Sequence, residues 1–144
     1  QNVDDLHERA GSESVLHLHG ELAKARSTAD PELILQVKGS EIREGDLCPL
    51  GSQLRPHIVW FGEMPYQMGR IYQALETCDL FVSIGTSGAV YPAAGFVQWA
   101  CDAGARTLEL NLEPSAGTPV FDEARHGPAS VLVPAWVEEL LAAR

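Results

Sequence analysis

From residue 58 onward, four short apolar runs recur along the chain. They are IVWFG (58–62), LFVSIG (80–85), TLELNL (107–112) and SVLVP (130–134). Continuous apolar runs of this length are typical of strands that are buried on both faces of a parallel sheet. Because stretches with helical spacing separate the runs, the pattern predicts an α/β fold with a doubly wound, mostly parallel sheet.

Helical spacing predicts three helices in the same region and a fourth near the front of the chain. The three are marked by apolar positions Met68, Ile71, Leu75 and Cys78, then Phe96, Val97, Ala100 and Cys101, then Val137, Leu140 and Leu141 in the closing segment PAWVEELLAAR. The front helix is VDDLHERAG (3–11), which stops at a glycine. Alternation in VLHLH (15–19) predicts a strand directly after it.

Residues 25–53 follow neither a helical nor a strand period. Structureless loops longer than about 15 residues are uncommon in compact domains, so this stretch is interpreted as a small inserted module. The predicted organisation is therefore one domain made of residues 1–24 and 54–144, interrupted by a module of residues 25–53.

Composition limits the class of function. The 144 residues carry a net charge of −10, which argues against a nucleic-acid binder because phosphate contacts need clustered Lys and Arg. No apolar run approaches the ~20 residues of a membrane span, and no secretory signal is present. Three cysteines without a CxxC pair predict no disulfide framework and a reducing, cytoplasmic setting.

Two predicted strands end in residues suited to ligand binding. GTSGAVYPAAG (85–95) offers free backbone N–H groups before a helix and favours an anion such as phosphate; the alternative is a simple turn capped by Thr86 or Ser87. NLEP (111–114) can accept the hydroxyls of a ribose; the alternative is an Asx turn at Asn111.

The segment HLHG places two histidines at strand spacing, so His17 and His19 are expected on one face. They could bind a metal, but no Cys or carboxylate with convincing ligand spacing accompanies them. His19, at the predicted end of the strand, is well placed to act as a general base. Before it lies QNVD (1–4), in which Asp4 could simply cap the front helix.

Six motifs in one order resemble the sirtuin (Sir2) family of NAD-dependent protein lysine deacylases, most closely its CobB-type, class III branch. They are QNVDDLHERAG, HLHGEL, LRPHIVWFGEMP, IGTSGAVYPAAGF, LNLEPS and GPASVLVP. The resemblance implies a Rossmann-like NAD-binding sheet and transfer of the acyl group of acyl-lysine (deacetylase or desuccinylase type) to ADP-ribose, with release of nicotinamide. Its implied partners are acylated lysine-containing proteins.

The resemblance also implies roles for individual residues. His19 matches the general base, and Asn2 and Asp4 match further catalytic residues. The implied NAD contacts are Gln1, Asn2, Asp4, Gly85, Thr86, Ser87, Asn111, Leu112, Glu113 and Ala129. The implied contacts to the acyl-lysine peptide are Phe61, Gly62, Glu63, Val90 and Tyr91.

Residues 25–53 stand where sirtuins insert a small zinc module with two close cysteine pairs. Here Ser27 occupies the position of the first cysteine, and Cys48 is the only thiol of the stretch. One thiolate cannot complete a tetrahedral zinc site, so zinc is predicted to be absent. The module is then expected to be held by apolar contacts from Leu33, Ile34, Leu35 and Val37.

The Gly-rich phosphate loop that opens the sirtuin sheet has no counterpart in this chain. The chain is therefore interpreted as incomplete at the N-terminus: a fragment of a longer polypeptide, or a piece that pairs with a second chain. Alone it is expected to bind NAD poorly. Two alternatives stay open, a non-catalytic NAD or ADP-ribose binding fragment and a structural remnant that oligomerises through an exposed sheet edge.

Overall fold

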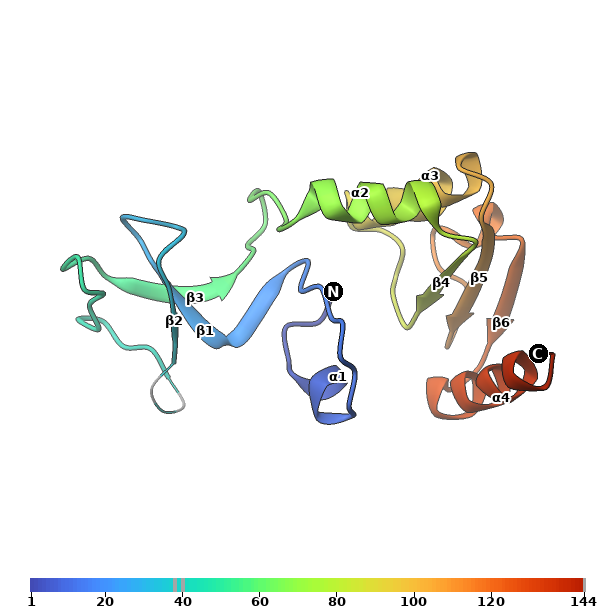
Figure 1. The fold of residues 1–144 in the computed structure, drawn as a ribbon, viewed down its shortest axis with the longest axis horizontal. Coiled ribbons are helices and arrows are strands. Elements are labelled where there is room, and N and C mark those ends of the chain that lie inside the picture. The colour runs from blue at the N-terminus through green and yellow to red at the C-terminus, as the bar shows by residue number, and fades with distance from the viewer. Residues whose placement is uncertain (38, 40, 144) are drawn as a thin grey trace. The chain divides into compact units, whose positions relative to one another are not determined.

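The computed structural model describes residues 1–37, 39 and 41–143 of this α/β protein (Figure 1). It divides into two compact units, Gln1–Met68 and Gly69–Arg144, which are described separately as the first and second unit. No helix among the described residues is long and apolar enough to cross a membrane. The domain assignment made from the sequence stays a prediction.

The first unit is built on an antiparallel sheet in the order β2-β1-β3. After the short helix α1 (Leu6–Arg9), its strands are β1 (Gly20–Ser27), β2 (Ile34–Gln36) and β3 (Leu54–Ile58). Arg26 pairs with Ile34 on one side of β1 and with Arg55 on the other. The stretch after residue 25 therefore contributes strands to this sheet.

Two predicted strands of the first unit are wrong. In VLHLH, Leu18 and His19 form a turn, and β1 begins only at Gly20. Gly20 has a φ of +86°, and a Cβ there would lie 2.0 Å from the carbonyl oxygen of His57. The chain therefore reverses tightly at a position that glycine alone tolerates, which the alternation of side chains does not reveal.

The run IVWFG is also not a parallel strand. Ile58 ends the antiparallel strand β3, and the chain then turns, with the N–H of Glu63 donating to the carbonyl of Trp60. The side-chain carboxylate of Glu63 accepts the N–H of Trp60 in return, which holds the segment in a loop.

The second unit contains a parallel sheet in the order β4-β5-β6 (Figure 1). Its strands are β4 (Leu80–Ile84), β5 (Arg106–Asn111) and β6 (Glu123–His126). Its helices are α2 (Met68–Thr77), α3 (Phe96–Asp102) and α4 (Ala129–Ala142), with short 3-10 turns at Ala93–Gly95 and Thr118–Val120. The predictions of β4, β5, α2 and α3 are confirmed.

The core of the second unit surrounds β5. Thr107, Leu108, Glu109 and Leu110 are all buried, and α3 and α4 both contact this strand. On α3, the buried residues lie at the helical spacing expected from the sequence.

The run SVLVP was predicted as a strand and lies in α4 instead, with Pro134 inside the helix. The real neighbour of β5 is β6, whose sequence EARH has little apolar character and was missed. A short apolar run fits a strand and a helix equally well, and here Gly127 and Pro128 end the strand and start the helix. A helix at the end of the chain is confirmed through Ala142; Arg144 lies outside the described residues.

Candidate functional site

His19 lies half-buried in the turn that precedes β1. Its Nδ1 atom is 3.0 Å from the backbone carbonyl oxygen of Gln1. A carbonyl oxygen only accepts hydrogen bonds, so Nδ1 carries a proton, and in the neutral ring Nε2 is then the nitrogen with the lone pair. The ring is therefore held as the tautomer that can accept a proton at Nε2.

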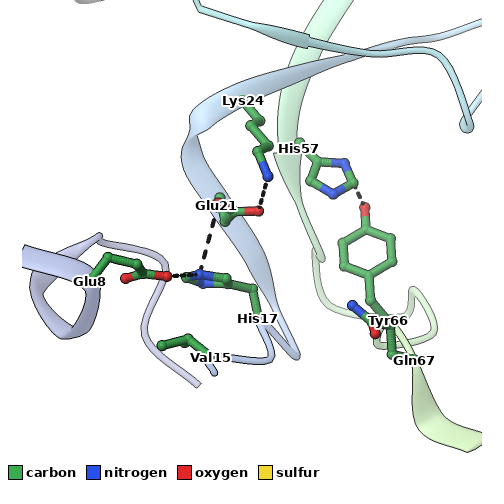
Figure 2. Close-up of a pocket in the computed structure, with 8 residues that line it drawn as sticks. All are labelled: Glu8, Val15, His17, Glu21, Lys24, His57, Tyr66 and Gln67. Carbon is green, nitrogen blue, oxygen red and sulfur yellow. Dashed lines mark hydrogen bonds and ion pairs between the residues drawn. The ribbon is translucent and has the colours of Figure 1, made fainter. Parts of the chain in front are cut away.

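His17 has a different environment, although only one residue separates the two histidines. Its Nε2 lies 2.5 Å from a carboxylate oxygen of Glu8 and 3.8 Å from one of Glu21, which also binds Lys24 at 2.6 Å (Figure 2). The hydrogen bond from His17 contributes to a lowered pKa of Glu8, after the larger effect of a backbone hydrogen bond. Among the described residues, no group of three or more possible ligands could hold a metal ion.

His17, Glu8 and Glu21 line one pocket of the first unit (Figure 2). A second imidazole, that of His57, lines it too, and no role was predicted for this residue from the sequence. Its ring stacks on Tyr66 with centroids 4.5 Å apart. Burial, and then the charge of Arg26, lower the pKa of His57. The buried position of His57 and its lowered pKa favour the neutral form of the ring.

The residue at the N-cap position of α1 is Asp5, which makes no side-chain cap hydrogen bond, so Asp4 precedes the cap that the sequence assigned to it. The carboxylate of Asp4 accepts the N–H of Leu6 at 3.1 Å, while the side chain of Asn2 is exposed. Gln1 contributes its backbone carbonyl to His19. Asp4 thus has a structural partner in the first residue of α1.

In the predicted substrate segment, Phe61 is 98% exposed and Gly62 is exposed, but Glu63 is half-buried. Its carboxylate accepts from Arg55 at 2.5 Å and from Arg26 at 3.0 Å. The hydrogen bond from Arg55 and that from the N–H of Trp60 lower the pKa of Glu63 to about 2.

Arg55 also stacks over the Trp60 ring at 3.7 Å. The side chain of Glu63 is therefore engaged in shaping this loop. Sequence reasoning gave neither arginine a role: Arg26 is remote in sequence from Glu63, and Arg55, although it stands in the motif LRPHIVWFGEMP, was not singled out.

In the second unit, the two predicted NAD-binding segments lie next to each other. The side-chain N–H₂ of Asn111 donates to the carbonyl of Thr86 at 2.8 Å, and the N–H of Ala116 donates to the carbonyl of Ser87 at 3.1 Å. Gly85 has a φ of +63° with open space where a Cβ would stand. The glycine turn after β4 is thus uncrowded at Gly85, whose N–H donates to the carbonyl of Leu110 near the end of β5.

The other predicted residues of this unit are accessible. The exposed residues are Leu112, Glu113, Ala129, Val90 and Tyr91. Ala129 is the first residue of α4, and Glu113 stands two residues after the end of β5. The turn interpretation of GTSG also has support, because Ser87 Oγ accepts the N–H of Ala89 at 3.4 Å.

The module of the first unit does not offer a fit for structural zinc. Cys48 is buried and its thiol donates to Ser27 Oγ at 3.2 Å, so the one thiol is bonded to the hydroxyl that stands in place of a cysteine. Three residues after Ser27 the sequence has Asp30, and three residues after Cys48 it has Gly51, so neither position adds a second thiol. Of the residues predicted to hold the module, Ile34 is 41% exposed, whereas Leu33, Leu35 and Val37 are half-buried. Ala25, Ser27 and Cys48 are buried as well.

Comparison with known proteins assigns the family. Residues 1–92 match the Sir2 family. The chain is 58% identical over its whole length to a Vibrio cholerae protein called NAD-dependent protein deacylase, of which it covers 59%. It covers 57% of a chain in a solved Sir2 homolog–NAD complex at 36% identity and a TM-score of 0.88, with 99% of this chain aligned.

A further solved structure, a Sir2–p53 peptide–NAD+ complex, is 28% identical with a TM-score of 0.82; the match takes in all of this chain and 62% of that one. The fold and these matches define an α/β protein with the Rossmann-like fold of the Sir2 structures. The chain belongs to the Sir2 family. It spans about three fifths of the length of the relatives that it matches.

Proposed function

We propose that this chain is the part of an NAD-dependent protein lysine deacylase that carries the general base. Three things support the proposal: membership of the Sir2 family, the name of the Vibrio cholerae relative, and the NAD and peptide found with related structures. The single observation that carries it is the hydrogen bond from His19 Nδ1 to the Gln1 carbonyl.

That hydrogen bond leaves Nε2 of His19 ready to accept a proton from a hydroxyl. When bound, NAD supplies a ribose carbon that can be attacked with loss of nicotinamide, and a ribose hydroxyl that takes up the acyl group. His19 then accepts the proton of the attacking hydroxyl, which makes that oxygen a better nucleophile. A positioned base of this kind contributes roughly 10²- to 10⁴-fold to a rate.

The proposed NAD contacts fall in two groups, one in each unit. Gln1, Asn2 and Asp4 belong to the segment whose Gln1 carbonyl contacts His19, and they are proposed to contact the nicotinamide ribose, with Asn2 and Asp4 as further catalytic residues. In the second unit the proposed contacts are Gly85, Thr86, Ser87, Asn111, Leu112, Glu113 and Ala129. The open space at Gly85 and the exposed Glu113 support this group, since backbone N–H groups suit phosphate and a carboxylate suits ribose hydroxyls.

The proposed substrate is an acylated lysine in an extended peptide. Phe61 and Gly62 are exposed in the turn after β3 and are proposed to contact this peptide, and Val90 and Tyr91 are proposed as its contacts in the second unit. Glu63 is proposed to support substrate binding indirectly, because its ion pairs with Arg26 and Arg55 hold the loop that contains Phe61 and Gly62.

The test uses a chimera in which the Vibrio cholerae relative supplies the part that this chain does not match. Nicotinamide release is measured with NAD and an acylated lysine peptide. We expect turnover that His19→Ala lowers by roughly 10²-fold or more, while ADP-ribose binding survives. The matched control is His17→Ala, which breaks the Glu8 pair and leaves turnover largely intact.

Equal turnover in the chimera and in His19→Ala would refute the base assignment. ADP-ribose binding without turnover in the unmutated chimera would favour the non-catalytic alternative. Absence of binding together with concentration-dependent assembly would favour the structural remnant.

We also propose that the inserted module is free of zinc and that the protein works in the cytoplasm. The Cys48–Ser27 hydrogen bond supports the first point. Metal analysis of the purified chimera tests it, and one zinc per chain bound through residues of this stretch would overturn it.

A further inference from the structure

Glu109 is a carboxylate in the centre of the buried strand β5. It is 1% exposed, and its strand neighbours Leu108 and Leu110 are buried apolar residues. A buried carboxylate is costly unless hydrogen bonds replace its water shell. The structure therefore has to provide partners for it, and they show what the residue does.

Those partners come from the segment after β5 and from β6. The hydroxyl of Thr118 donates to a Glu109 oxygen at 2.5 Å, and His126 Nε2 lies 3.4 Å from the same oxygen. Burial raises the pKa of Glu109, but hydrogen bonds from Ser115, Thr118 and His126 outweigh it, so the pKa lies below its ordinary value. Glu109 is thus an ionised acceptor.

Thr118 and Ser115 close a small turn on top of this carboxylate, called here the 115–118 turn. The N–H of Ser115 donates to Thr118 Oγ1 at 2.8 Å, and the N–H of Gly117 donates to Ser115 Oγ at 3.1 Å. One hydroxyl, that of Thr118, therefore links the turn to the strand by accepting from the turn and donating to Glu109.

The 115–118 turn also packs against the glycine loop that follows β4, residues 85–88. The N–H of Ala116 donates to the carbonyl of Ser87 at 3.1 Å. Gly88 has a φ of +62°, and a Cβ there would lie 3.0 Å from Ser115 Oγ. The loop therefore lies in close contact with the turn and cannot shift independently of it.

Asn111 makes the second link between the same parts. It stands two residues after Glu109, on the same face of the strand, and its side chain binds the carbonyl of Thr86. The segments proposed for phosphate and for ribose are thus joined by Asn111 and by the 115–118 turn, which rests on Glu109.

We propose that Glu109 is a positioning residue for NAD binding: through Thr118 it holds the 115–118 turn, which fixes the Gly85–Ser87 loop beside Asn111. This inference rests on the proposed function. Glu109 itself is buried and touches no ligand; it acts by keeping the loop in the arrangement that the dinucleotide needs.

The test uses the chimera with three variants and one control. Glu109→Gln replaces an accepting oxygen with an N–H₂ group that faces other donors, and Thr118→Val removes the hydroxyl that joins turn and strand. Thr118→Ser keeps that hydroxyl and should restore the behaviour of the unmutated chimera. The control is Asp122→Asn, because Asp122 accepts the N–H and O–H of Thr107 at 2.8 and 3.0 Å near the opposite end of the same strand.

The first readout compares the change in the KM for NAD with the change in kcat for each variant. We expect Glu109→Gln and Thr118→Val to raise the KM for NAD by roughly tenfold with a much smaller change in kcat, the size expected when a buried hydrogen bond is broken. Asp122→Asn should lower stability and leave this KM unchanged. An equal effect on KM in Asp122→Asn and Glu109→Gln, or no effect in Thr118→Val, would overturn the proposal.

The second readout needs no turnover. Amide exchange at Ala116, whose N–H binds Ser87, should accelerate by roughly tenfold in Glu109→Gln and stay unchanged in Asp122→Asn. If the unmutated chimera binds no NAD, the proposed function fails, yet exchange still reports whether Glu109 holds the turn. Unchanged exchange at Ala116 in Glu109→Gln and Thr118→Val would contradict the inference by itself.

Discussion

The two units hold a glutamate by different means. In the first unit, Glu63 is partly exposed and lies between the guanidinium groups of Arg26 and Arg55. In the second unit, Glu109 is buried and is bound by a hydroxyl and an imidazole. A loop held by partly exposed ion pairs is expected to lose stability in acid. A loop held by hydrogen bonds to a buried residue is expected to be sensitive to substitutions that remove a donor or an acceptor.

The largest expected effect comes from the turn that begins β1. Gly20→Ala should cost about 4 kcal/mol or more and prevent the first unit from folding, since a Cβ would meet the His57 carbonyl at 2.0 Å. Urea unfolding of the chimera measures the loss. The control is Gly45→Ala, where φ is +93° but no atom lies within 4 Å, so only about 1 kcal/mol is expected. Equal losses at the two glycines would contradict the role of the close approach.

The core of the second unit should give the next largest effect. Leu110 is fully buried in β5, so Leu110→Ala should lower the free energy of unfolding by about 3 kcal/mol through lost burial and a cavity. Leu112, two residues on, is 65% exposed, and Leu112→Ala should change the stability by less than about 0.5 kcal/mol. A similar loss in both variants would show that β5 is not the core.

Acid should act on the first unit through Glu63. Its pKa is lowered from 4.5 to about 2, so the stability that its arginine pairs provide is fully present above about pH 4.5 and is lost as the pH falls toward 2. Glu63→Gln should remove this part of the dependence of unfolding on pH. Acid titrations of both proteins test it, and identical curves would count against the pairing with Arg55 and Arg26.

The smallest effect is expected at an exposed ion pair of the first unit. Arg43 and Glu41 pair with side chains that are 74% and 59% exposed. Solvent screens such pairs, so Arg43→Ala should change the free energy of unfolding by no more than about 0.5 kcal/mol. A loss as large as that of Leu110→Ala would mean that charges outside Glu63 also organise this unit.

The same contrast explains what the sequence could predict. Strands β4 and β5 follow from continuous apolar runs, and Thr86 and Asn111 meet because the ends of neighbouring parallel strands share one edge of the sheet. The run SVLVP was wrongly predicted as a strand because its apolar pattern fits a helix equally well. VLHLH was wrongly predicted as a strand because the chain reversal at Gly20 depends on a close contact with β3, which is remote in sequence.

Within the candidate site, sequence reasoning chose His19 and passed over the residues that support the loops. Arg26 meets Glu63 because its strand β1 pairs with β3, and no local sequence pattern predicts that contact. Arg55 lies in β3 and reaches Glu63 from eight residues earlier in the chain. Glu109 did leave a signal: an acidic residue inside the apolar run TLELNL has to find partners when the strand is buried.

The protonation of the two neighbouring histidines tests the account most directly. In ¹⁵N spectra of the chimera near neutral pH, His19 should carry its proton on Nδ1 with an unprotonated Nε2, because its partner is the Gln1 carbonyl. His17 should carry a proton on Nε2, which faces the Glu8 carboxylate. A proton fixed on Nε2 of His19 would contradict its assignment as the proton acceptor.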